Sequence, residues 1–151
     1  ALWVILYGLI QANAPRILRA KTRPTDELIK VARDWAWRLA AVPTILTGVA
    51  IIAGEPQLWL TISLVTGLLI FGIVFAVNSS LHSYLILSFT KAERVTMDVG
   101  FYYMANAAGR LAGTLLSGLT YQICGLPLML GVAAFMVALS AIMVGLLKPE
   151  R

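Results

Sequence analysis

The chain has 151 residues, of which 60% are hydrophobic and 13% are charged, and its mean hydropathy is +0.85. Soluble domains carry about 25% charged residues, so this composition cannot cover a surface that faces water and instead predicts an all-α membrane protein. The formal net charge of +5 would suit a nucleic-acid-binding protein, but the positions of the basic residues favour another explanation. The single cysteine, Cys124, cannot form a disulfide within the chain.

Five segments approach the roughly 20 apolar residues that a helix needs to cross a bilayer. These predicted spans are residues 1–18, 37–54, 58–89, 99–122 and 126–147. The third would be about 48 Å long at about 1.5 Å per residue, so it must tilt, bend or extend beyond the bilayer. The chain opens inside an apolar segment with no basic residue before it, which argues against a signal peptide and leads us to expect a fragment of a longer protein.

Basic residues alternate between the predicted loops. Lysine and arginine occur at 19–36, at 90–98 and after residue 147, whereas the loops at 54–57 and 123–125 contain neither. The positive-inside rule places the basic loops in the cytoplasm. We therefore expect a multi-pass protein of the plasma (inner) membrane with its C-terminus in the cytoplasm. Because this topology accounts for the charge, we expect the lipid bilayer as a partner and no nucleic acid.

The segment from 25 to 35 has an apolar face formed by Leu28, Val31, Ala32 and Trp35. This pattern fits a short helix that lies on the inner leaflet, and it fits a solvated loop equally well.

A polar stripe crosses the fourth predicted span. Tyr102, Asn106, Arg110 and Thr114 recur every four residues, so they share one face of the helix. An adjacent face carries only small residues at the same spacing, namely Ala105, Gly109, Gly113 and Ser117. Such a ladder lets the backbone of another helix approach closely, so we expect it to pack against a neighbouring helix.

Arg110 lies about 16 Å into its span by helical rise, close to the middle of the bilayer. A charge at that depth costs at least about 2.5 kcal/mol, so the side chain should face protein or a wet cavity. One interpretation is structural, in which Arg110 caps carbonyl groups or pairs with an acid elsewhere. The other is a site for an anion, because no acidic residue of this chain lies at that depth and a guanidinium binds phosphate and carboxylate groups with two hydrogen bonds.

Antiparallel pairing of the third and fourth spans would place Asn78 level with Arg110, and His82 level with Asn106. Together with Tyr102 and Tyr103, these residues could line a substrate cavity. For His82 alone, a hydrogen bond between helices explains the residue as well as ligand contact does. No second histidine, cysteine cluster or carboxylate pair accompanies it, so we expect no metal site, no cofactor and no enzymatic activity.

The string NSSLHSYLILSFTKAERVTMDVGFYYMANAAGRLAGTLLSGL, residues 78–119, resembles the major facilitator superfamily of transporters. Within that superfamily it is similar to the organoarsenical efflux permeases of the ArsJ type, and the opening ALWVILYGLIQANAPRIL resembles their eighth span. The resemblance implies that the chain is the C-terminal part of a twelve-span carrier, spans eight to twelve, and that the N-terminal half is its partner. The loop APRILRAKTRP departs from the superfamily by lacking the Asp-Arg pair of its gating loop.

The family implies export of 1-arseno-3-phosphoglycerate, a small anion with phosphate and arsenate groups, and hence arsenate resistance. Two other hypotheses remain open. The chain could belong to a major facilitator carrier for a different organic anion, such as a sugar phosphate or a carboxylate, or it could be a non-transporting subunit of a membrane complex.

Overall fold

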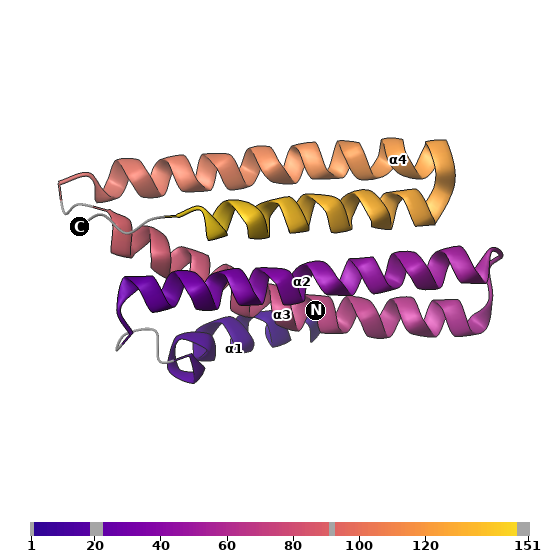
Figure 1. Cartoon of the computed structure of the whole chain (residues 1–151), viewed down its shortest axis with the longest axis horizontal. Coiled ribbons are helices and arrows are strands. Elements are labelled where there is room, and N and C mark those ends of the chain that lie inside the picture. Colours follow the sequence, from indigo (N-terminus) through magenta and orange to yellow (C-terminus); the bar gives the residue numbers. More distant parts are fainter. Residues whose placement is uncertain (1, 19–22, 91–92, 148–151) are drawn as a thin grey trace.

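The computed structural model describes residues 2–18, 23–90 and 93–147, and all regular secondary structure within these ranges is helical. The helices are α1 (Leu2–Ile17), α2 (Thr25–Ala53), α3 (Leu58–Phe89) and α4 (Val95–Gly145). Among the described residues, α2, α3 and α4 are long and apolar enough to cross a membrane, which confirms the all-helical class and agrees with a membrane protein. Helix α1 is shorter, with 16 residues, and it begins near the middle of the long axis of the bundle (Figure 1).

Helix α4 turns back on itself at Cys124 and Gly125. Both residues leave the helical region, and Gly125 adopts a φ of 68°, a conformation that costs little only for glycine. Pro127 lies within the first turn of the returning segment, where a missing backbone N–H removes no helical hydrogen bond. We call residues 95–123 the first arm and residues 126–145 the second arm; the two run antiparallel (Figure 1).

Helix α2 begins at Thr25, well before the span predicted from residue 37. Its first turn contains Asp26 and Glu27, which interact favourably with the positive end of the helix dipole. The apolar face of this segment is buried at Leu28 and Ala32. Residues 25–35 are therefore neither a separate interfacial helix nor a loop, because their apolar face packs inside the protein as the first turns of α2.

Helix α2 is the centre of the bundle, since it packs against both α3 and α4, whereas α1 packs against α3. The buried side chains form two clusters, one at each end. The cluster near the start of α2 consists of Ala14, Leu28, Ile29, Ala32, Val77, Leu81, Leu85 and Val144. The cluster near the end of α2 consists of Leu46, Ala50, Ala53, Leu60 and Leu130. The second arm lies beside α2 in Figure 1, and the first arm lies on the far side of the second.

A close approach between α3 and α2 occurs at Gly67. A Cβ atom built on this residue would lie 2.6 Å from Cδ2 of Leu46 in α2, much closer than atoms pack. By contrast, a Cβ atom built on Gly109 or Gly113 would meet nothing within 4 Å. The small-residue ladder of the first arm therefore makes no tight helix contact with the described residues, and the close packing occurs at a glycine outside that ladder.

Replacement of Gly67 by valine tests the importance of this contact. We expect Gly67→Val to lower the free energy of unfolding by about 1–3 kcal/mol, the usual cost of inserting extra carbon atoms into a packed core, because the valine side chain would displace Leu46. Thermal unfolding in detergent would measure the change.

Gly109→Val is the matched control, because the same substitution is made in a helix above open space. It should change the free energy of unfolding by less than about 0.5 kcal/mol. If both variants lost the same stability, the cost would come from placing a β-branched residue in a helix, and the Gly67–Leu46 contact would not be important.

Candidate functional site

Arg110 lies in the interior of the first arm, 15 residues after Val95, or about 22 Å along the helix at about 1.5 Å per residue. Its side chain is exposed. Within the described residues, Arg33–Asp34 is the ion pair found, so Arg110 pairs with no acid there. Its backbone carbonyl accepts a hydrogen bond of 2.9 Å from Oγ1 of Thr114. The guanidinium is therefore exposed and held by no partner among the described residues.

The other predicted site residues of the first arm precede Arg110 on the same largely open helix. Asn106 and Tyr103 are exposed and Tyr102 is half-buried. The rings of Tyr102 and Tyr103 lie 5.6 Å apart between centroids. Almost the whole arm from residue 101 to 119 is exposed, apart from Tyr102 and Leu116. The polar stripe thus lies on a helix that the rest of the described chain leaves largely uncovered.

Asn78 of α3 is buried, with 9% of its surface exposed. Its side-chain oxygen Oδ1 is buried and has no hydrogen-bond partner among the described residues. Leaving a buried acceptor without a donor costs about 1–3 kcal/mol. An unpaired buried amide oxygen of this kind requires a reason, and a ligand or another protein segment that donates a hydrogen bond would supply one.

His82 lies one turn after Asn78 and is half-buried. Its Nδ1 lies 2.9 Å from the backbone oxygen of Asn78. A carbonyl oxygen can only accept a hydrogen bond, so Nδ1 carries the proton and donates it. This hydrogen bond is made within α3. The imidazole ring of His82 is therefore oriented by its own helix, and not by the predicted hydrogen bond to another helix. In the neutral imidazole, Nε2 is then the acceptor.

The structure does not contain the predicted antiparallel pairing of α3 with the first arm. The two elements are close where α3 ends and α4 begins, and α3 then slopes away behind α2 (Figure 1). Contact between α3 and α4 is the slightest among the helix pairs that touch. Asn78 and His82 therefore form one group on α3, and Tyr102, Tyr103, Asn106 and Arg110 form another on the first arm. The described chain does not join them in one closed cavity.

An apolar pocket of about 460 Å³ lies between the first arm and the remaining helices. One wall belongs to the first arm, namely Gly109, Ala112, Gly113, Leu116, Ser117 and Thr120. Pro43 and Leu46 of α2, Leu68 and Phe71 of α3, and Met129, Leu130, Val132, Ala133, Met136 and Val137 of the second arm form the other walls. Since Asn78, His82, Asn106 and Arg110 do not line this pocket, it is separate from the predicted anion-binding residues. The small-residue ladder was the feature of the sequence that pointed to this part of the first arm. From the sequence we predicted that the ladder packs against a neighbouring helix, and not that it lines a pocket.

The described residues contain no group of three or more His, Cys, Asp or Glu side chains that could hold a metal ion. The chemistry available at the two groups is hydrogen bonding and cationic attraction. Arg110 offers five N–H donors, while Asn78, Asn106 and the tyrosines offer neutral donors and acceptors.

Comparison of the chain with protein-family models, with curated proteins and with solved structures finds no match. An assignment of function therefore depends on the residues themselves and on their arrangement.

The unpaired oxygen of Asn78 leads to a prediction about stability. We expect Asn78→Leu to raise the free energy of unfolding by about 1 kcal/mol, because it removes a buried acceptor that has no donor. Thermal unfolding in detergent would measure the change.

Asn106→Leu is the control for stability, since it makes the same exchange at an exposed position of the first arm. Its free energy of unfolding should change by less than about 0.5 kcal/mol. A loss of stability in Asn78→Leu would show that the amide oxygen has a partner in the complete protein.

Proposed function

We propose that this chain is part of a membrane transporter that exports a small anionic organoarsenical, 1-arseno-3-phosphoglycerate, and thereby confers arsenate resistance. In this proposal the chain contributes five membrane spans, with the two arms of α4 as separate spans, to the C-terminal half of a twelve-span major facilitator carrier. It resides in the inner (plasma) membrane with its C-terminus in the cytoplasm, and it acts as a carrier without enzymatic activity.

The observation that carries the proposal is Arg110, an arginine without an acidic partner among the described residues in the interior of an apolar helix. A guanidinium in the hydrocarbon layer is costly, so its position calls for a compensating negative charge. A phosphate or arsenate group supplies that charge, and its oxygens match the two-pronged geometry of the guanidinium.

The exposure of the first arm also supports a larger assembly. Its polar stripe would face lipid if nothing covered it, and polar side chains in that position are unfavourable. In the proposed carrier, the N-terminal half covers this face and completes a polar cavity around Arg110, Asn106 and the tyrosines. Asn78 and His82 would contribute from α3 where the halves enclose the substrate.

The choice of substrate depends on the family likeness of residues 78–119. The residues alone support the broader class of organic anions, so a sugar phosphate or a carboxylate is the second candidate for the same site. A non-transporting membrane subunit is the third; in that case a partner protein would have to supply both the counter-charge of Arg110 and the donor for the buried oxygen of Asn78.

The proposal predicts that Arg110→Ala abolishes arsenate resistance in cells that depend on the full protein, with membrane expression unchanged. Transport should fall by at least about tenfold, because hydrogen bonds that involve a charged group contribute about 1.5–3 kcal/mol. Arg110→Lys should recover only part of the activity, since lysine keeps the charge but loses the two-pronged geometry. Growth in arsenate and uptake into everted vesicles would measure these effects.

Arg94→Ala is the control, because it removes an exposed basic residue just before α4 and outside the apolar arm. It should retain resistance. If Arg110→Ala also retained resistance, Arg110 would have a structural role. Uptake of a sugar phosphate or a carboxylate in place of the organoarsenical would select the second candidate.

A further inference from the structure

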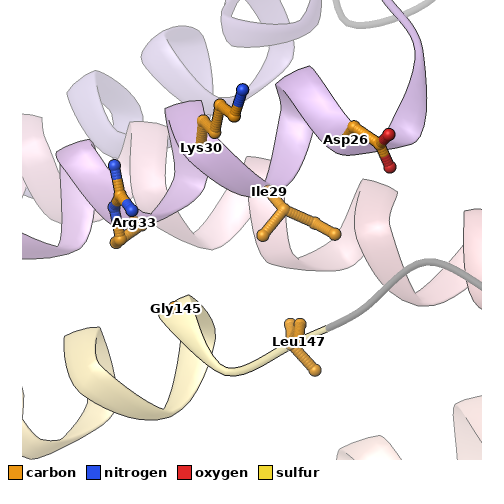
Figure 2. A pocket seen from close by; sticks show the side chains of 6 residues that line it. All are labelled: Asp26, Ile29, Lys30, Arg33, Gly145 and Leu147. Carbon is orange, nitrogen blue, oxygen red and sulfur yellow. The ribbon is translucent and has the colours of Figure 1, made fainter.

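A second pocket lies at the opposite end of the bundle from the α4 turn, between the first turns of α2 and the end of the second arm. Its volume is about 290 Å³, and it is lined by Asp26, Ile29, Lys30, Arg33, Gly145 and Leu147. Figure 2 shows the four side chains of α2 on one side and Gly145 and Leu147 on the other. The pocket therefore lies where α2 begins and α4 ends.

The charged lining of this pocket comes entirely from α2. Lys30 and Arg33 lie one helical turn apart and are exposed. The ammonium of Lys30 points away from Gly145 and Leu147 in Figure 2, so it reaches a ligand in the pocket by a change of rotamer. Asp26 contributes one carboxylate to the lining, and the guanidinium of Arg33 lies 3.4 Å from Asp34, a pair that is about half exposed on both sides. Such a pair is weak in water. The guanidinium therefore remains available to an anion whose charge density is higher than that of the Asp34 carboxylate.

Gly145 determines how closely Arg33 approaches the second arm. A Cβ atom built on Gly145 would lie 3.2 Å from Cδ of Arg33. The absence of a side chain at Gly145 thus allows the aliphatic stem of Arg33 to lie against the end of α4. The last turn of α4 contains no basic residue of its own, and Arg33 supplies a positive charge near its negative dipole end.

Apolar surface surrounds the same pocket. Ile29 and Leu147 line it from opposite sides. Beside it, the end of the second arm exposes Ile142 at 47%, Met143 at 52% and Leu146 at 66%. A ligand that fits both features has an anionic head that reaches the cations and long apolar tails that cover the exposed side chains.

The aromatic residues beside the pocket fit a position at the level of the membrane interface. Trp37, which lies one turn beyond Arg33, is 47% exposed, and the guanidinium of Arg38 lies 5.0 Å from the ring centroid of Trp35. Tryptophan is enriched at the boundary between headgroups and hydrocarbon, and arginine stacked on an aromatic ring keeps its charge there.

We infer that this pocket binds the headgroup phosphate of an anionic phospholipid, with Lys30 and Arg33 as the phosphate ligands and the acyl chains along the exposed end of the second arm. Basic pockets between membrane helices on the cytoplasmic side bind such headgroups. A free phosphate ion would use the two cations but would leave the apolar rim uncovered. The inference is independent of the transport proposal, since it needs only a chain embedded in a membrane.

Native mass spectrometry of the full protein in detergent, titrated with phosphatidylglycerol or with phosphatidylcholine of the same acyl chains, tests this site. Phosphatidylglycerol should bind more tightly than phosphatidylcholine. Lys30→Gln and Arg33→Gln should each weaken its binding about fivefold, the factor that corresponds to about 1 kcal/mol for one cation at a membrane surface. Gly145→Val should also weaken binding, because it displaces Arg33 while it retains both charges.

Arg94→Gln is the matched control, since Arg94 is exposed and precedes α4 at the same end of the bundle but does not line the pocket. It should bind phosphatidylglycerol as the unmodified protein does. An equal loss in Arg94→Gln would overturn the site in favour of general surface charge, and so would equal affinity for the two lipids. Displacement of the lipid by millimolar inorganic phosphate would identify a site for the free ion and would overturn the lipid assignment. If Arg33→Gln fails to fold, Lys30→Gln alone decides the outcome.

Discussion

The packing of Leu46 against Gly67 joins the central helix of this protein to its neighbours. Leu46 occupies the space that a side chain on Gly67 would fill, and it also belongs to the buried cluster that includes Leu130 of the second arm. One residue of α2 therefore packs against α3 and belongs to the buried cluster that extends to α4. The first arm is exposed over most of residues 101–119, and it connects to the second arm through the turn at Gly125.

This unequal packing explains the difference between the two groups of predicted site residues. Asn78 lies on α3, which α1 and α2 both cover, so its amide is buried and its oxygen is unpaired. Arg110 lies on the arm that the rest of the chain leaves exposed. Both situations are unfavourable in a membrane, the first because an acceptor lacks a donor and the second because a cation lacks a counter-charge. A ligand or protein segment between the two groups would relieve both.

Polar residues within apolar segments were visible in the sequence, and this made Asn78, His82 and Arg110 recognisable as candidates. Their relative placement was not predictable in the same way. Equal depth in two antiparallel spans does not require that the spans touch, and here the second arm packs against α2 while α3 diverges from the first arm. The pocket formed by Lys30 and Arg33 was also missed, because those residues belong to a predicted loop and meet Gly145 only through the packing of α2 on the second arm.

The sequence by itself determined the helical class, the bounds of α3 and the turn in α4. Long apolar runs must form helices in a membrane, where backbone groups can find partners only within the chain, and the Cys-Gly-Leu-Pro sequence supplies both the positive φ and the missing N–H that a tight turn tolerates. Tertiary structure alone decided that α2 begins at Thr25, that Gly67 and not Gly109 makes the close contact, and which side chains share a pocket. The physical reason is that each of these depends on which helices become neighbours, and a pattern along one helix does not specify the helix that it faces.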